Sequence, residues 1–152
     1  MKKVSPVIQA ITAMREQNIG RLLQRAMRDF SKRAIGHLQE YGYTDLTPFQ
    51  AEAISYISLE GTYITELAKR LGTTKQTAGE VVSHLEKQGY IQRASDKNDK
   101  RATIIMFTSK GKEFLRIAYE VKIRIEQEYV TLLGKNKFVE LIILLKTISN
   151  NS

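Results

Sequence analysis

The chain of 152 residues contains no cysteine. Disulfide bonds, thiolate nucleophiles, cysteine-based redox sensing and thiolate metal sites are therefore excluded. Only two histidines are present, His37 and His84, and no paired acidic motif lies near either of them. Because a metal site needs several converging ligands, the sequence predicts no metal and no cofactor. A nucleophile elbow, a phosphate-binding loop and a dinucleotide fingerprint are also missing, so we do not expect an enzyme.

Long apolar runs are missing as well. No segment approaches about 18 consecutive apolar residues, and residues 1–17 have no sustained apolar core followed by a cleavage site. The sequence therefore predicts no membrane partner, and we expect a cytoplasmic protein. With 42% hydrophobic and 26% charged residues, the composition is that of an ordinary globular protein. The length suffices for one domain with a real core, or for two small lobes that share one.

Acidic residues are in deficit. Against 24 Lys and Arg there are only 16 Asp and Glu, which gives a formal net charge of +8. Ten of these basic residues and five of the acidic ones lie between positions 62 and 112, so this segment carries five of the eight excess charges. Such a concentration is the footprint expected of a surface that binds a polyanion. The alternative is a basic protein that is merely soluble.

Residues 65–91 have the pattern of two short helices joined by a tight turn. Apolar residues recur at helical spacing on both sides of Gly72, in the sets Leu67, Ala68, Leu71 and Ala78, Val81, Val82, Leu85. Gly72 can adopt a positive φ and end the first helix, and Thr73 or Thr74 can cap the second. This is the pattern of a helix-turn-helix.

The outward face of the second helix carries short or flexible polar groups. They are Gln76, Gly79, Glu80, Ser83 and Lys87, with Lys75 and Thr77 beside them at the first turn. The backbone N–H groups and the positive end of the helix dipole at that turn suit a phosphate. Gly79 costs roughly 1 kcal/mol relative to Ala in a helix, but its missing side chain would let the backbone approach a groove wall. The alternative is a solvated face with a tolerated glycine.

Two segments after this helix predict strands. Residues 90–93 and 102–108 are rich in β-branched and aromatic side chains, and the polar residues 94–101 between them include turn formers. Residues 62–64 predict a short third strand at the edge of the same sheet. A hairpin directly after a helix-turn-helix is a wing, so this region reads as a winged helix-turn-helix.

The order and spacing of several short motifs carry a family resemblance. The motifs are LTPFQ (46–50), ITELAKRL (64–71), TKQT (74–77), LEKQGYI (85–91), Asp96, Asp99, Arg101 and TSKG (108–111). The arrangement resembles the multiple-antibiotic-resistance regulator (MarR) family of winged-helix transcription factors. Members place the second helix in the major groove of DNA and the wing arginine in the adjacent minor groove. The candidate DNA-binding residues are therefore Thr74, Lys75, Gln76, Thr77, Ser83, Lys97, Lys100 and Arg101.

One position departs from the family pattern. Relatives often carry a basic residue at position 80, whereas this chain has Glu80. An acid that points at a groove repels phosphate, although it can accept a hydrogen bond from cytosine N4. Pairing with Lys87 or His84 is another alternative, and the role of Glu80 stays open at this point.

Helical segments flank the winged region at both ends. Apolar residues recur at helical spacing from Ile8 to Leu38. The sequence of residues 47–50 predicts a helix start, with Thr47 as cap, Pro48 at the first position and Gln50 completing a capping box. That helix is expected to continue to about Leu59.

The last third of the chain predicts two more helices. Thr108 or Ser109 caps a long one, which residues 134–137 break. The final helix contains the apolar run 141–145, which covers more than one helical face. A terminal helix of a small protein cannot bury so wide a face against its own chain, so we expect a second subunit to cover it. The alternative is that the first helix covers it within one chain. The family precedent agrees with dimerisation through the two chain ends.

Aromatic residues gather near the expected junction of the helical and winged lobes. In relatives this junction holds a pocket for small, often phenolic, anions. The resemblance therefore implies an effector pocket for a small aromatic anion, with basic side chains meeting its charge. The candidates are Arg21, Arg25, His37, Tyr41, Phe49 and Tyr56. The alternative is ordinary core and hinge packing.

Together these observations predict a mainly α fold with a small β wing. Residues 46–111 form the winged helix-turn-helix DNA-binding domain, and residues 1–45 and 112–152 form a helical dimerisation region. The expected function is a sequence-specific transcriptional regulator of double-stranded DNA, usually a repressor in such families, that acts as a homodimer on a pseudo-palindromic operator. The alternatives are a non-specific or architectural DNA-binding protein and a winged-helix module for protein interaction.

Overall fold

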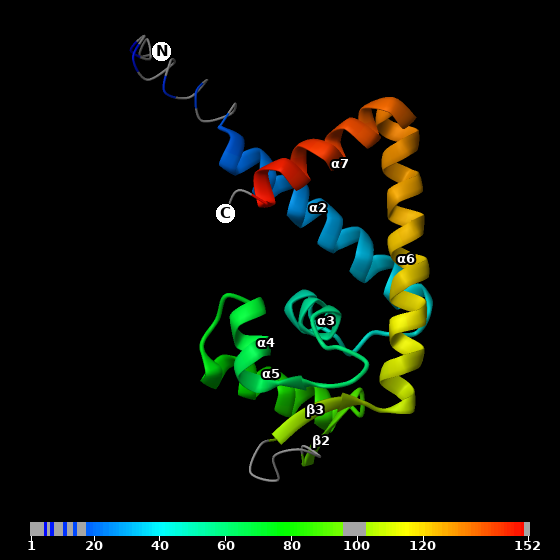
Figure 1. Cartoon of the computed structure of the whole chain (residues 1–152). Helices are drawn as coiled ribbons and strands as arrows, with labels where there is room; N and C mark the ends of the chain where they lie inside the picture. The colour runs from blue at the N-terminus through cyan, green and yellow to red at the C-terminus, as the bar shows by residue number, and fades with distance from the viewer. Residues whose placement is uncertain are drawn as a thin grey trace.

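The computed structural model describes Ser5, Val7, Ile11 and Met14 singly, and residues 18–95 and 103–150 continuously. In chain order its elements are α2 (Ile19–Glu40), α3 (Pro48–Ser55), β1 (Thr62–Tyr63), α4 (Ile64–Arg70), α5 (Lys75–Lys87), β2 (Ile91–Ser95), β3 (Thr103–Phe107), α6 (Ser109–Leu133) and α7 (Lys135–Ser149). The predicted mainly helical fold with a small β wing is confirmed. Figure 1 shows α3, α4, α5 and the sheet at one end of α6, with α7 at its other end.

The start of α3 forms as the sequence predicts. The Thr47 hydroxyl accepts a hydrogen bond from the Gln50 backbone N–H at 3.2 Å, and the Gln50 side-chain oxygen accepts from the Thr47 N–H at 2.9 Å. Pro48 occupies the first helical position. The predicted end near Leu59 is wrong, because α3 stops at Ser55. The backbone N–H groups of the next two residues instead bond three residues back, which tightens the chain into a turn.

The sheet is antiparallel, with the strand order β1-β3-β2. Thr62 of β1 pairs with Ile105 of β3, so the predicted third strand is confirmed. On the other side, β3 pairs with β2 from Ile91 opposite Phe107 to Ser95 opposite Thr103. The hairpin tip, residues 96–102, lies outside the described residues.

One continuous core lies beneath the winged lobe and extends along the first part of α6. Its buried apolar residues come from the end of α2, from α3 to β3, and from α6 as far as Ile125. The most enclosed large side chains include Tyr90, Phe114 and Ile54. By contrast, α7 buries no residue and α2 buries only Leu38. The single chain therefore leaves its α2 and α7 end without a core of its own.

An aromatic cluster fixes the start of α6 against the winged lobe. The ring of Phe114 meets those of Tyr43 and Tyr90 edge-on, at centroid distances of 5.1 and 5.4 Å. The buried Tyr90 hydroxyl donates to the Asp45 carboxylate at 2.7 Å, and the Lys110 ammonium lies 4.1 Å from the Tyr90 ring centroid. Burial, reinforced by the Asp45 contact, raises the pKa of Tyr90. These contacts tie the α2–α3 connection to the base of the wing.

Ion pairs hold α2 along the second half of α6. The Glu128 carboxylate accepts from Arg33 at 2.8 Å and contacts the His37 ring nitrogen Nε2 at 2.8 Å. Arg124 pairs with Glu40 at 2.5 Å. The hydrogen bond from Arg33, helped by His37, holds the pKa of Glu128 below its ordinary value of 4.5. Because this carboxylate stays ionised at neutral pH, the ion pairs between α2 and α6 persist there.

Among the described residues, none of the helices combines the length and the apolar character that a membrane span requires.

Candidate nucleic-acid interface

The turn between α4 and α5 orients α5. Gly72 has φ = +62°, a left-handed conformation that suits glycine and ends α4. Of the two threonines that could cap the next helix, Thr74 does so, because its hydroxyl accepts from the Thr77 backbone N–H at 3.1 Å. The two threonine hydroxyls also lie 3.0 Å apart. The helix-turn-helix that the sequence predicts is therefore present, with its cap in place.

Helix α5 has a buried face and an exposed face. Its four predicted apolar residues are all buried against the winged-lobe core, namely Ala78, Val81, Val82 and Leu85. The opposite face carries a shallow, open hollow of about 400 Å³. Its lining residues are Gln76, Gly79, Glu80, Ser83, His84 and Lys87. A Cβ at Gly79 would meet nothing within 4 Å, so the missing side chain leaves open space on this face.

Two of the outward side chains are connected along the helix. The Gln76 side-chain nitrogen Nε2 donates to the Glu80 Oε1 at 3.3 Å. Among the ion pairs of the described residues, none joins Glu80 to Lys87 or His84. The contact of Glu80 in this structure is thus with the neighbouring glutamine one turn away.

A second contact joins the wing to α5. Arg93 at the base of β2 forms an ion pair with Glu86 and donates to the Ser83 hydroxyl at 3.0 Å. The Arg93 backbone N–H also donates to Glu86 at 3.0 Å. Ser83 in turn donates to the Gly79 carbonyl at 2.9 Å, so its hydroxyl is already engaged on both sides. These contacts fix the orientation of the wing relative to α5.

Arg93 and Glu86 were not among the residues predicted from the sequence. The available signal was weak: two opposite charges seven residues apart, separated by Gly89 with its positive φ of +80°. Of the residues predicted around α5, Lys75, Gln76, Thr77 and Ser83 lie on the helix, and Thr74 caps it. The predicted wing-tip residues Lys97, Lys100 and Arg101 lie outside the described residues. Their role in DNA binding stays a prediction.

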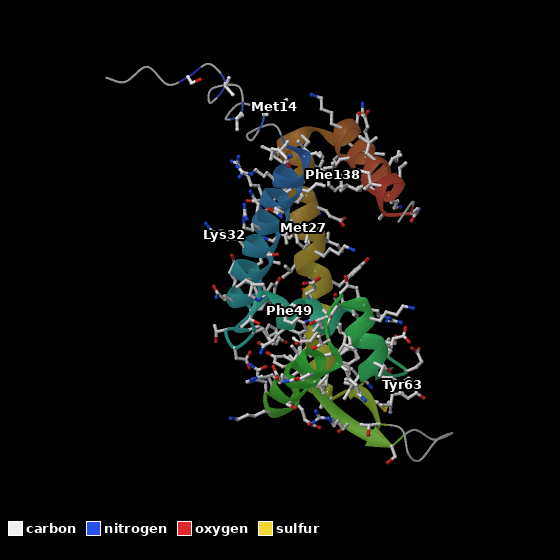
Figure 2. The ribbon with its side chains drawn as sticks, turned by 90° about the vertical axis from the view of Figure 1, so that its left-hand side faces the viewer. Met14, Met27, Lys32, Phe49, Tyr63 and Phe138 are labelled. Atoms are coloured by element: carbon white, nitrogen blue, oxygen red, sulfur yellow. The ribbon has the colours of Figure 1, made fainter. Side chains whose placement is uncertain are left out.

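The junction of the two lobes contains a cavity of about 420 Å³. It lies between α2, α3 and α6, and most of its lining is apolar, including Met27, Phe30 and Leu38. Figure 2 places Met27 on α2 close to α6. The polar lining groups are Ser31, Glu52, Ser55, Tyr56 and Lys122. The cavity can therefore enclose a small apolar body and offers one ammonium group, that of Lys122.

Of the six residues predicted for an effector pocket, only Tyr56 lines this cavity. The His37 ring contacts Glu128 and Glu40 instead. Arg21 and Arg25 are exposed in the first two turns of α2, and Tyr41 and Phe49 are 48% and 38% exposed. Lys122 was not predicted from the sequence, although its spacing from Ala118 and Ile125 places it beside the apolar stripe of α6. Among the described residues, no cluster of three or more His, Asp or Glu could hold a metal ion.

Comparisons with known proteins agree with this geometry. Residues 44–102 match the family model described as MarR family. The chain is 22% identical to the uncharacterized HTH-type transcriptional regulator YfiV of Bacillus subtilis over 62% of its own length and 59% of that protein. It is 40% identical to the transcriptional repressor MprA of Escherichia coli over 34% of its length, and this match spans 30% of MprA.

The likeness extends to whole folds. A solved structure of the transcriptional repressor CouR bound to a 23-mer DNA duplex superposes with a TM-score of 0.74 at 26% identity. That match covers 90% of this chain and 95% of CouR, and so includes the helices outside the winged lobe. Motif order, helix-turn-helix, wing and flanking helices all agree, and residues 44–102 place the winged part of the chain in the MarR family of winged helix-turn-helix transcriptional regulators.

Proposed function

We propose that the protein is a homodimeric, sequence-specific regulator of transcription that binds duplex DNA and represses the genes it controls. The observation that carries this proposal is the exposed polar face of α5. This face has a hollow lined by residues that include Gly79, and Arg93 of the wing is hydrogen-bonded to Ser83 of the helix. CouR, which shares this fold at 26% identity, was solved on a DNA duplex, and MprA is named a transcriptional repressor. The family is not one of enzymes.

The dimer would present two copies of α5 to one face of the DNA. In a two-fold dimer the recognition helices enter successive major grooves roughly 34–36 Å apart, which requires a pseudo-palindromic site. Support comes from the apolar side chains that α2 and α7 leave exposed, among them Leu22, Met27, Ile143 and Leu144. In both views α7 and the start of α2 lie at the end of α6 that is remote from the wing. Dimerisation there would leave both α5 faces open.

A binding selection on random duplexes tests this function directly. The full-length protein should enrich one motif with an inverted repeat whose half-site centres are about 10 base pairs apart. An architectural protein would bind duplexes in a salt-dependent manner without enriching a motif. A protein-interaction module would retain no duplex. Either of the last two outcomes would overturn the proposal.

Substitutions in α5 and in the wing should impair DNA binding in different ways. Gln76→Ala should cost on the order of 1–3 kcal/mol on the selected site and flatten the preference at one base pair per half-site, because glutamine reads adenine N6 and N7. Arg101→Ala should weaken binding to most sequences and lower the salt slope by about one unit per wing in contact, because it removes an arginine from the narrow minor groove. Binding titrations at several salt concentrations measure both effects.

Lys32→Ala serves as the matched control for these titrations. Lys32 is an exposed basic residue on α2, away from the winged lobe, and Figure 2 shows it at the surface of that helix. Its loss should leave affinity and salt slope unchanged. If Arg101→Ala behaves like Lys32→Ala, the wing does not touch DNA, and Arg101 only pairs with Asp96 or Asp99 in the hairpin.

The same proposal includes an effector that binds at the lobe junction. The cavity between α2, α3 and α6 is partly open and mostly apolar, and it suits a small aromatic ring. Lys122 would meet the charge of an aromatic carboxylate, and Tyr56 or the serines would bond a ring hydroxyl. Binding there would favour a dimer whose α5 spacing no longer fits the operator.

Titration with 2-hydroxybenzoate tests the effector site. It should release the selected duplex from the wild type, and Lys122→Ala should need on the order of tenfold more compound, because one charge-assisted hydrogen bond is lost. Lys32→Ala removes an exposed lysine of α2 that does not line the cavity, and it should respond like the wild type. Release that is equally sensitive in the Lys122 variant would place the effector elsewhere.

A further inference from the structure

The contact between Gln76 and Glu80 constrains the part of α5 that reads DNA. Gln76 lies in the first turn of α5, with its side chain exposed beside the hollow at Gly79. Its amide nitrogen donates to Glu80 Oε1 at 3.3 Å, one helical turn away. Both side chains lie on the same helix, so the helix geometry alone brings them within reach of each other.

The chemistry of the contact sets the orientation of the glutamine amide. A carboxylate only accepts hydrogen bonds, whereas an amide has a donor end and an acceptor end. Turning the amide by 180° would bring the Gln76 oxygen against a Glu80 oxygen, two acceptors facing each other. Glu80 therefore selects the orientation in which the nitrogen points toward it. A neutral glutamine at position 80 would impose no such choice, because it can donate as well as accept.

The orientation that Glu80 selects leaves one N–H and the carbonyl oxygen of Gln76 for DNA. Adenine presents one acceptor, N7, and one donor, N6, in the major groove, which match that pair of groups. With the amide fixed before binding, less rotamer freedom is lost on contact with the base. The open space at Gly79 removes the side chain that would otherwise stand next to this pair.

We propose that Glu80 is a positioning residue for sequence reading, whose carboxylate orients the Gln76 amide so that it can bind adenine. This orientation raises specificity, while the negative charge of Glu80 lowers the affinity for DNA of any sequence. The inference rests on the proposed function, since it concerns how the same helix reads its site. The lower affinity arises because the negative charge repels phosphate, and no described cation forms an ion pair with it. A basic residue at position 80 could not accept this hydrogen bond from the Gln76 amide.

The experiment uses the full-length protein, the duplex enriched by the wild type and all single base-pair variants of one half-site. The wild type should discriminate on the order of tenfold at one A·T pair. Gln76→Ala should abolish that preference. Glu80→Gln should reduce it to about twofold at the same pair while raising affinity for unrelated duplexes. The double variant should show no further loss of preference, because the two residues act through one contact.

Glu60→Gln is the matched control, since it removes one exposed negative charge from the winged lobe away from α5. It should leave the preference at every position unchanged. If Glu80→Gln raises affinity for all duplexes equally and keeps the preference, Glu80 acts by charge alone and the inference is wrong. Loss of preference at a different pair, a C·G pair, would mean that Glu80 reads cytosine directly. If the proposed function itself were wrong, the wild type would enrich no sequence, and this outcome is distinguishable from a failure of the Glu80 inference.

Discussion

A chain shortened by residues 134–152 should be monomeric and should bind a selected full operator on the order of 10²- to 10⁴-fold more weakly than the full-length protein. The loss arises because two half-sites engaged by one dimer give a large gain from effective concentration, which separate monomers forgo. Helix α7, which the deletion removes, buries no side chain within its own chain. The winged lobe, whose core does not include α7, should keep its fold.

Point variants distinguish loss of the dimer from loss of the helix. Leu144 and Ile148 lie one turn apart on α7 and are 54% and 58% exposed, so a charge at either position is tolerated by the monomer. Leu144→Glu combined with Ile148→Glu should reproduce the effect of the deletion on mass and DNA affinity, as sedimentation and binding titrations would measure. Glu140→Gln on the same helix is the control. A doubly substituted protein that stays dimeric would refute the proposed interface.

Gly111→Ala should destabilise the protein by at least about 2–3 kcal/mol, the range of severe overpacking. A Cβ at this position would lie 2.0 Å from the Tyr90 carbonyl oxygen and 2.8 Å from the Phe107 ring. That carbonyl cannot simply move, because it already accepts from the Thr108 N–H at 3.1 Å, and the Thr108 hydroxyl holds the adjacent Gly89 carbonyl at 2.6 Å. The first turn of α6 would have to shift away from the base of the wing.

Denaturant unfolding followed by circular dichroism, at one fixed protein concentration, measures this loss. For a chain of this size it corresponds to a fall in Tm of roughly 5–10 °C. Gly36→Ala is the matched control: Gly36 lies within α2 and a Cβ there meets nothing within 4 Å. That substitution should stabilise by about 0.5–1 kcal/mol. Equal midpoints for Gly111→Ala and wild type would show that α6 does not pack so closely on Tyr90.

Local signals in the sequence predicted most of the fold. The capping box at Thr47, the Thr74 cap, the positive φ at Gly72 and the apolar stripe of α5 each depend on residues within one or two helical turns. The short strand β1 was predictable because β-branched residues there precede a helix start. The end of α3 was misjudged because apolar residues continue beyond Ser55, where Ile57 is buried from a turn rather than from a helix.

The contacts that the sequence did not reveal join residues far apart in the chain. Arg33 and Glu128 are 95 positions apart, and Tyr90 and Asp45 are 45 apart. No periodicity brings such residues together, since only the packing of α2 on α6 and of the α2–α3 connection on the base of the wing does so. The same holds for the junction cavity, where Lys122 faces helices that precede it by more than 60 residues. The position of Lys75, Gln76 and Thr77 on one helix was predictable, because they follow one another in the sequence; their role in reading DNA stays a prediction.

Helix α6 gives the molecule a mechanical property of its own. Its 25 residues form one unbroken rod of roughly 37 Å, anchored to the wing at its start by Phe114 and to α2 near its end by Glu128. A rod of that length acts as a lever arm, whose far end moves by about 0.6 Å for every degree of tilt. A tilt of about 5° near the remote end would carry the wing and α5 through roughly 3 Å. A small tilt of α6 near its remote end therefore becomes a larger displacement of α5 and the wing at the other end of the helix.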